Sequence, residues 1–314
     1  MLLLLKFNML RLLLPACLML TMFSSESVQA LQLQRYPDIT SFLHSFAKRN
    51  NFSEAALRQL FSRVVLRPEL VSAMQKPAEG MAWERYRKIF VNPANLKRGH
   101  RFTVKYARIL RRAEKKYGVD RYVIAAIIGV ETRFGQHLGK NRTLDALTTL
   151  AFLYPRRGRF FRAELEHFLL LTQEQKLDPL QLRGSYAGAI GIPQFMPSSY
   201  RQYAVDLDGD GKRNLMQYAD AIGSVANYLQ AHGWQQGKNI AVPAVVTSSA
   251  TTQRWLARKL RTVTTVATLQ QSGIRGIENE RPDRLVGLVE LVSLRSKIFL
   301  LSPAIIVVGC MRLP

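Results

Sequence analysis

Cysteine is almost absent from this sequence. Only Cys17 and Cys310 occur among its 314 residues, and Cys17 lies in an N-terminal segment that we expect to be a targeting signal. No intramolecular disulfide framework is therefore expected in the mature chain. With 47% hydrophobic and 9% aromatic residues, the composition excludes an intrinsically disordered chain. The fold must depend on a buried apolar core or on a bound metal.

The apolar run at the N-terminus, over residues 12–23, is shorter than the ~20 residues that a membrane-spanning helix needs. It follows Lys6 and Arg11 and precedes a polar stretch that ends in Ala30. This order is typical of an export signal. We expect residues 1–30 to be cleaved off and the mature protein to lie in the periplasm.

An alternative stays open within the same segment. The letters LPAC, from Leu14 to Cys17, resemble a bacterial lipoprotein box, in which the cysteine is lipidated. The apolar run continues past Cys17, which favours a simple signal instead. The two interpretations differ in whether a lipid anchors the protein to the outer membrane.

Acidic residues are scarce. The chain has 22 Asp and Glu against 45 Lys and Arg, for a net charge of +23. Such a balance usually indicates an anionic partner. Nucleic acid is the common one, but the export signal argues against a nucleic-acid binder. We expect an anionic cell-wall polymer or a membrane surface instead.

Apolar spacing predicts an α+β protein that is mainly helical. Apolar residues at three- and four-residue spacing indicate an N-terminal helical lobe over 31–105, followed by a helical core over 106–236. From 237 the sequence becomes rich in Val and Thr, which predicts a small β lobe over 237–285. Residues 286–314 have a different, atypical texture.

Glu131 directly follows the apolar helix segment VIAAIIGV. Burial disfavours the ionised form of a carboxyl group, so its pKa is expected to rise. A carboxyl group that holds a proton near neutral pH can act as the general acid in glycosidic bond cleavage. The alternative is a helix-end glutamate paired with Arg133 or another arginine.

The segment GAIGIPQFMPSSY, Gly188 to Tyr200, breaks the helical pattern. Its small residues would let the backbone approach a ligand closely. Gln194 offers both a donor and acceptors, which suit sugar hydroxyls and amides. The alternative is a tight turn between core helices.

The segment DLDGDGKRNLMQYAD resembles a calcium loop. Asp206, Asp208 and Asp210 occupy its positions one, three and five, and Lys212 can offer its backbone carbonyl at seven. Position twelve is Gln217, where a bidentate Glu is expected. We expect a structural Ca²⁺; the alternative is a surface turn neutralised by nearby cations.

Several of these motifs together resemble one family. ETRFG, RRGRFFRAELEHFLLL, GSYAGAIGIPQFMPSSY, the acidic loop and DAIGSVANYLQAHGW occur in this order between residues 131 and 234. This arrangement resembles the membrane-bound lytic transglycosylase B family, whose core is lysozyme-like. The resemblance implies a lyase that cleaves the β-1,4 bond between N-acetylmuramic acid and N-acetylglucosamine in peptidoglycan and leaves a 1,6-anhydro ring.

The resemblance also implies roles for individual residues. Glu131 would act first as acid and then as base, and Asp220 would close the calcium loop. Arg156 and Arg157 would bind the carboxylates of peptide stems; the alternative is that they form a solvated basic turn. Further substrate contacts are implied for Ser185, Gln194, Tyr228 and Tyr86.

The C-terminal sequence departs from the family. An Asn-aromatic-x-x-Ile-x-x-Tyr-Asn motif is expected near the end, and LVELVSLRSKIFLLSPAIIVVGCMRLP lacks it. We therefore hypothesise that residues 286–314 are a C-terminal tail altered by a shifted reading frame or a truncated gene. The leading interpretation is a monomeric, peptidoglycan-cleaving enzyme that binds glycan strands, and the alternative is a non-catalytic wall-binding protein.

Overall fold

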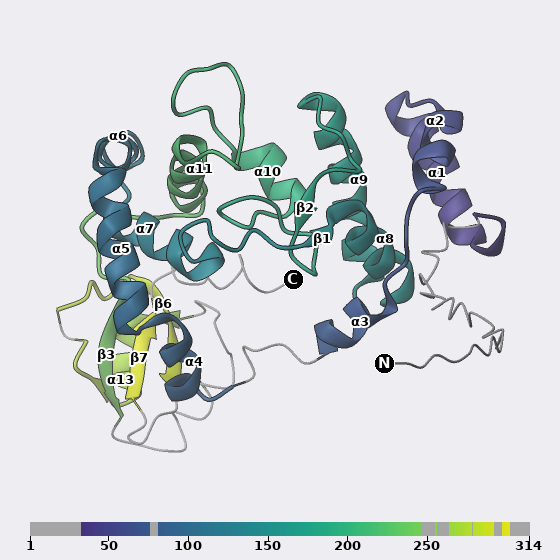
Figure 1. The fold of residues 1–314 in the computed structure, drawn as a ribbon. Coiled ribbons are helices and arrows are strands. Elements are labelled where there is room, and N and C mark those ends of the chain that lie inside the picture. Colours follow the sequence, from purple (N-terminus) through teal and green to yellow (C-terminus); the bar gives the residue numbers. More distant parts are fainter. Residues whose placement is uncertain are drawn as a thin grey trace, which may run out of the picture.

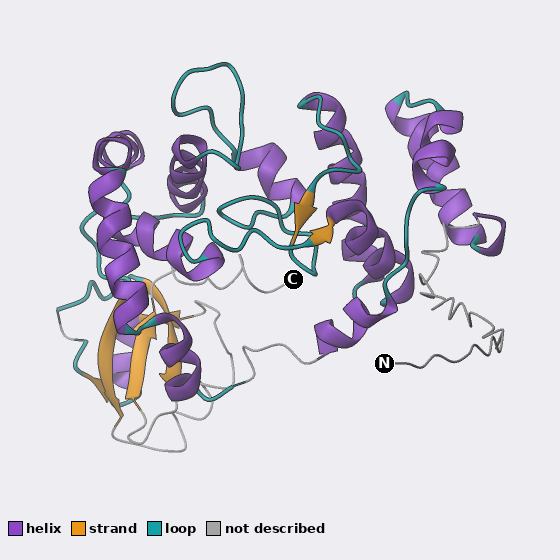
Figure 2. Cartoon of the chain, viewed as in Figure 1, coloured by secondary structure: helices purple, strands orange, loops and turns teal. Residues whose placement is uncertain are grey.

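The computed structural model describes residues 33–75, 81–246, 255, 264–277, 279–291 and 297–301. Helices form most of it, five strands gather in one small sheet, and two very short strands pair elsewhere (Figures 1 and 2). The signal expected over 1–30, with Cys17, and the end of the tail after residue 301 lie outside these ranges. Within them, no helix has both the length and the apolarity to cross a bilayer.

The described part begins with a 3-10 turn, η1 (Leu33–Arg35), and three helices, α1 (Pro37–Asn50), α2 (Glu54–Phe61) and α3 (Pro68–Gln75). Ser53 caps α2 by accepting a hydrogen bond from the Ala56 N–H at 3.2 Å. The segment between α2 and α3 is bound to helix α8 (Thr143–Leu153), because the Val65 N–H donates to Asp145 Oδ1 at 3.1 Å. Helix α3 packs on α8, α1 contacts α8 through the rings of Phe42 and Phe152 (5.7 Å), and α2 packs on α1 (Figure 1).

The next three helices lie on the other side of the molecule (Figure 1). They are α4 (Trp83–Phe90), α5 (Pro93–Lys105) and α6 (Ala107–Tyr117). Helix α5 packs on α7 (Arg121–Thr132), and α6 packs on α7 and α11 (Tyr218–Ala231). The helices expected to form one N-terminal lobe thus cover two sides of the core.

The core itself combines α7, α8 and α11 with α9 (Gly158–Glu174) and α10 (Pro197–Tyr203). Helices α8 and α9 are separated by a short segment that contains Pro155. Two strands of two residues each, β1 (Asn141–Arg142) and β2 (Arg183–Gly184), pair antiparallel although they are far apart in the sequence. One apolar cluster runs from α1 to α11, so these helices share a single core.

The last part is a five-stranded antiparallel sheet with strand order β4-β6-β7-β3-β5. Its apolar cluster is separate from the helical one and includes Val266, Leu269 and Val286. The sheet runs on to Leu301, beyond the boundary expected at residue 285, because β7 pairs with both β6 and β3. Its elements are β3 (Ala241–Val246), β4 (Thr264–Thr265), α13 (Val266–Gln271), β5 (Ile274–Arg275), β6 (Leu285–Leu291) and β7 (Lys297–Leu301).

Candidate active site

Glu131 lies in the last turn of α7 and is half-buried. The helix starts where the Asp120 carboxylate caps it by accepting the Tyr122 N–H at 2.7 Å. It ends where Arg133 adopts a left-handed backbone with φ 48°. Both ends of this apolar helix are therefore defined, by the Asp120 cap and by the left-handed Arg133, and the position of Glu131 in its last turn is fixed.

Thr132 connects this helix end to the segment Gly188–Tyr200. Its side chain is fully buried, and its hydroxyl donates toward the carbonyl oxygens of Ile128 (3.2 Å) and Ile192 (2.9 Å). The same oxygen accepts the Gly135 N–H at 3.0 Å. The residue adjacent to Glu131 thus contacts a loop sixty residues further along the chain.

The chain after Thr132 makes an unusually tight turn. Arg133, Phe134 and Gly135 all have positive φ, at 48°, 62° and 83°. The turn folds the Phe134 ring back over Gly129 of α7, where an added Cβ would come within 2.5 Å of the ring. Tyr218 of α11 then donates to the Phe134 carbonyl oxygen at 3.0 Å. Helices α7 and α11 thereby hold the turn from both sides.

The segment Gly188–Tyr200 forms a compact turn whose first eight residues are all buried. The Ser185 hydroxyl oxygen accepts the N–H groups of Ala187 (3.2 Å) and Ala189 (3.0 Å). Gly188 is required because a Cβ there would lie 2.5 Å from Leu147. Both interpretations of this segment therefore have a structural basis: it is a tight turn, and it lies against the helix end that carries Glu131.

Gln194 is 8% exposed and has a left-handed backbone with φ 53°. Its amide nitrogen donates to the carbonyl oxygens of Gly191 (2.7 Å) and Leu138 (3.2 Å). The donors expected for a ligand thus hold the turn closed, and neither bond uses the amide oxygen. The aromatic ring of the next residue, Phe195, is 1% exposed and packs 5.3 Å from that of Tyr228.

The two tyrosines expected at the site lie in different surroundings. Tyr228 of α11 is 6% exposed and stacks on His232, with ring centres 4.1 Å apart. Tyr86 of α4 is half-buried beside Trp83 and Phe90. Tyr228 therefore belongs to the buried core and packs on Phe195 of the turn, while Tyr86 lies on a helix outside the core.

Arg156 and Arg157 lie at the turn from α8 to α9, where they line an open hollow of about 950 Å³. The guanidinium of Arg157 lies 4.2 Å from the centre of the Phe160 ring, and burial lowers its pKa. One of its terminal nitrogens is buried and has no hydrogen-bond acceptor within the described residues. Arg156 is exposed. Arg157 is thus more than a solvated turn residue.

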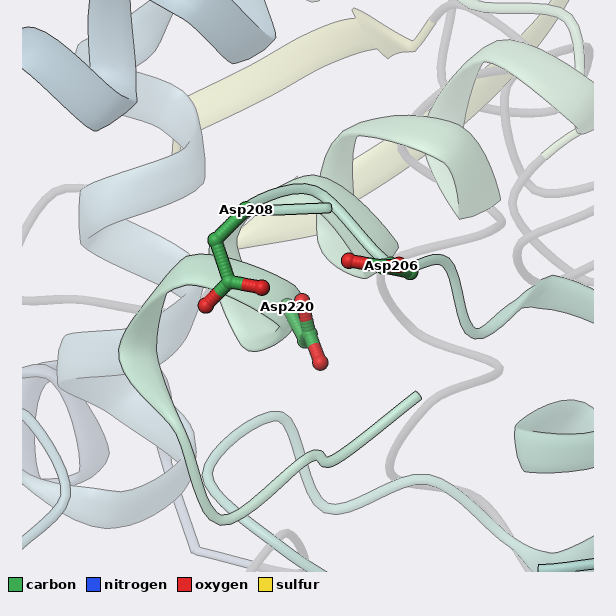
Figure 3. A group of neighbouring side chains, drawn as sticks. All are labelled: Asp206, Asp208 and Asp220. Carbon is green, nitrogen blue, oxygen red and sulfur yellow. The ribbon is translucent and has the colours of Figure 1, made fainter. Parts of the chain in front are cut away.

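Three carboxylates of the acidic segment lie close together (Figure 3). Oxygen atoms of Asp206, Asp208 and Asp220 all lie within 4.8 Å of one another. Asp210, exposed, falls outside this group and accepts the Lys212 N–H at 2.8 Å. Clustered hard oxygen ligands are suited to Ca²⁺ rather than to a soft metal.

The environments of these carboxylates differ. Asp206 accepts the N–H groups of Gly209 (2.6 Å) and Gly211 (2.8 Å), which lower its pKa. Asp220 is 1% exposed, and burial raises its pKa; the neighbouring charges of Asp208 and Asp206 add to the rise. The N–H groups of Leu207 (2.9 Å) and Asn214 (2.7 Å) favour its ionised form, and a nearby cation would stabilise that form further. The residues therefore fit a divalent cation.

Comparison with known proteins identifies the family. The model of the transglycosylase SLT domain family matches residues 34–301, which is most of the chain. The chain belongs to this family. The membrane-bound lytic murein transglycosylase B of Escherichia coli (strain K12) is 46% identical over 218 residues, which are 66% of this chain and 60% of that protein. The alignment thus spans about three fifths of the relative's length.

Solved structures of the family agree with the fold. The soluble lytic transglycosylase SltB1 from Pseudomonas aeruginosa, in a catenated form, is 40% identical, with a TM-score of 0.83 over 88% of this chain and 92% of that one. The Escherichia coli lytic transglycosylase Slt35, in complex with calcium, is 36% identical, with a TM-score of 0.78 over 92% of both chains. The mainly helical, lysozyme-like fold predicted from the sequence is confirmed.

Two residues that the sequence did not single out, Thr132 and Tyr218, form hydrogen bonds at the end of the helix that carries Glu131. A threonine next to a candidate acid, at the end of an apolar helix, is the one local signal for Thr132. Its partner at Ile192 could not be inferred, because the contact crosses sixty residues. Tyr218 gave no local signal, since it acts through a backbone oxygen on another helix.

Proposed function

We propose that the chain is a lytic murein transglycosylase that cleaves peptidoglycan between N-acetylmuramic acid and N-acetylglucosamine, with Glu131 as its acid and base. The observation that carries the proposal is the attachment of the Glu131 helix end to the turn Gly188–Tyr200 through the Thr132–Ile192 hydrogen bond. Membership of the transglycosylase SLT domain family and the similarity to two lytic transglycosylases support the same activity.

The reaction needs only one carboxyl group. Glu131 donates its proton to the glycosidic oxygen, which leaves with the N-acetylglucosamine end as the bond from the muramoyl C1 breaks. The resulting carboxylate takes the proton from the muramoyl C6 hydroxyl, whose oxygen bonds to C1 and closes the 1,6-anhydro ring. No water is consumed, so no second carboxylate has to activate one.

The turn and its neighbours form the proposed sugar site. The amide oxygen of Gln194 accepts from a sugar hydroxyl or amide, while the amide nitrogen keeps the turn closed. The Ser185 hydroxyl, which accepts two backbone N–H groups, still has its own proton to donate. Tyr228 supports the turn by packing on Phe195, and Tyr86 contacts the substrate from α4.

The basic hollow at the α8–α9 turn takes the carboxylates of peptide stems. Arg157 presents a terminal nitrogen that lacks an acceptor, and Arg156 lies exposed beside it. Guanidinium groups bind carboxylates through paired hydrogen bonds, which suits this role. The proposal thus assigns substrate charge to the hollow and sugar chemistry to the turn.

The acidic loop holds a structural Ca²⁺. Asp206, Asp208 and Asp220 supply the central carboxylates, and Asp210 and the backbone carbonyl of Lys212 complete the ligand set. The calcium complex of Slt35 supports this assignment. The ion neutralises the carboxylates around Asp220 at the start of α11, the helix that also carries Tyr218 and Tyr228.

We place the mature protein in the periplasm, acting as a monomer on glycan strands, with lipidation of Cys17 as its means of outer-membrane attachment if the lipoprotein box is used. The helical part over 31–236 carries the chemistry, and the sheet forms an appended lobe. The Escherichia coli relative is a membrane-bound lytic murein transglycosylase, which supports a membrane-associated cell-wall enzyme.

Digestion of purified sacculi tests the activity. The wild-type chain should release anhydromuropeptides, which are lighter by one water than hydrolysis products, and Glu131→Gln should abolish the release. Glu69→Gln, which changes an exposed glutamate of α3, is the matched control and should leave the release unchanged. Reducing-end products would overturn the mechanism. Sacculus binding without products, unaffected by Glu131→Gln, would establish the non-catalytic alternative.

A further inference from the structure

Helices α5 and α6 carry a stripe of cations that the proposed reaction does not use. Backbone hydrogen bonds with helical spacing continue across their junction, from Tyr106 N to Phe102 O (2.9 Å) and from Leu110 N to Tyr106 O (2.9 Å). The two helices are therefore joined directly at Tyr106. Exposed cations recur along them at three- and four-residue steps, at Lys97, Arg101, Lys105, Arg108, Arg111, Arg112, Lys115 and Lys116.

The opposite side of the same helices is apolar. Phe102, Leu110, Ala113 and Tyr117 are buried and belong to the helical core. Packing on α7 and α11 thus fixes these two helices with the cations turned outward. We call this surface, from Lys97 to Lys116, the cationic stripe.

The cationic stripe lacks local counter-charges. Glu114 is the only acidic residue of α5 and α6, and it pairs instead with Arg121 at 3.1 Å. Among the described residues, no stripe cation lies within salt-bridge distance of a carboxylate. Like charges three and four residues apart destabilise a helix. Lys105 and Lys116 lie over the rings of Tyr106 and Tyr117, each at 5.2 Å, but no described carboxylate neutralises the stripe, which is therefore suited to an external anion.

Apolar side chains interrupt the cations and narrow the choice of partner. Leu96 and Val104 are 63% and 64% exposed, more than any other large hydrophobic residue of the described chain. Phosphates of nucleic acid and carboxylates of peptide stems offer nothing for two exposed aliphatic groups to enter. A bilayer offers anionic headgroups for the cations and an acyl boundary for the aliphatic groups.

We propose that the cationic stripe docks the folded enzyme on an anionic lipid bilayer. The contact comes from α5 and α6 and does not depend on lipidation of Cys17. It would add to a lipid anchor as a second attachment or provide the only one, because single weak membrane signals bind reversibly. The stripe also gives a specific location to part of the excess of positive charge.

Vesicle co-sedimentation of the full chain tests the proposal. Vesicles of phosphatidylcholine with about one third phosphatidylglycerol should bind the protein at least ~10-fold more strongly than pure phosphatidylcholine at ~0.1 M salt, since screening is moderate there. Pure phosphatidylcholine vesicles also measure any insertion of the N-terminal apolar segment, which does not depend on lipid charge.

Arg108→Glu/Arg112→Glu/Lys115→Glu should abolish the preference for anionic vesicles. Lys48→Glu/Arg63→Glu/Arg275→Glu removes as many exposed cations from other surfaces and should retain it. Leu96→Ser/Val104→Ser should weaken binding to anionic vesicles with no change in net charge. Circular dichroism checks that each variant is folded, and Arg112→Gln supplies a milder change if the triple variant is not.

Equal losses in the two triple variants would overturn the proposal and leave only non-specific charge. So would retention by sacculi alone, with no preference for anionic vesicles, because the partner would then be the cell-wall polymer.

Discussion

Thr132 shows how one side chain positions the candidate acid. Its hydroxyl joins the carbonyl oxygens of Ile128 and Ile192 and the N–H of Gly135. Removal of this hydroxyl would leave its buried backbone partners without a hydrogen bond. An unsatisfied buried polar group lowers the free energy of unfolding by about 1–3 kcal/mol. The contact that fixes the place of Glu131 is therefore also a contact that stabilises the fold.

We expect Thr132→Val to lower kcat on soluble glycan fragments by roughly 10- to 100-fold with a much smaller change in KM, because misplacement of the acid affects the chemical step more than binding. Thr132→Ser keeps the hydroxyl and should restore most of kcat. Steady-state kinetics with thermal melts of both variants separate the two effects. A loss of stability with kcat intact would show that Thr132 has only a structural role.

Asp208 offers a specific test of the calcium loop. It is exposed and lies in the three-carboxylate group, so its charge can be removed with little effect on the core. Ca²⁺ should raise the Tm of the wild type, because a ligand bound only by the native state stabilises it by mass action. Asp208→Asn should abolish the rise, Asp210→Asn should reduce it less, and Asp38→Asn should retain it. Calorimetry with and without a chelator measures each shift, and equal rises in Asp208→Asn and wild type would contradict the site.

Helices α9 and α10 are joined by polar contacts. Arg201 of α10 donates from Nε and Nη2 to the Glu174 carboxylate, at 3.1 Å and 2.6 Å, and these bonds lower the pKa of Glu174. A second carboxylate of α9, that of Glu164, accepts the N–H and the hydroxyl of Ser198 at 3.0 Å and 2.7 Å. Helix α10, which continues the turn Gly188–Tyr200, is thus fixed to α9 at two places.

The lowered pKa of Glu174 sets the sign of its pH dependence. A depressed carboxyl pKa contributes stability that is present above the unfolded value, near 4.5, and is lost as the pH falls through the folded value. Because the side chain is 37% exposed, the contribution is about 0.5–1 kcal/mol. Glu174→Gln should lower the free energy of unfolding by this amount at pH 7 and by nearly nothing below pH 3. Urea unfolding at both pH values measures it, and an equal loss at both would exclude the ionic contribution.

At the scale of the molecule, the described residues form two separate apolar cores. The helical core extends from α1 to α11, whereas the sheet packs its own small cluster around Val266, Leu269 and Val286. The ion pair of Arg284 with Glu280 and the bonds of both residues to Asn239 hold the sheet near the end of the helical part. Cores of unequal size joined by polar contacts favour unfolding in two steps.

We expect calorimetry to resolve two transitions, of which the sheet gives the first. Val286→Ala, in the sheet core, should lower only the first midpoint, and Leu147→Ala, in the helical core, only the second. Both side chains are fully buried, so the losses should be about 1–3 and 2–5 kcal/mol, respectively. A single transition shifted by both variants would show that the two cores unfold together.

Local patterns in the sequence predicted the secondary-structure elements and the family resemblance. Apolar periodicity predicted the helices, Val and Thr enrichment predicted the β lobe, and the acidic spacing predicted the loop in which Asp206 and Asp208 meet. These features depend on residues close together in the chain, where propensity and spacing act directly. The resemblance to lytic transglycosylases, carried by ordered motifs, was likewise readable and is confirmed at the level of family and fold.

The tertiary structure decided which groups meet. Only folding places Thr132 against Ile192, commits the nitrogen of Gln194 to holding its own turn, and leaves Asp210 outside the three-carboxylate group. Only folding divides the expected N-terminal lobe between two sides of the core and carries the sheet on to Leu301. Each of these results depends on contacts between distant segments, whose geometry is set by packing of the whole chain and not by local sequence.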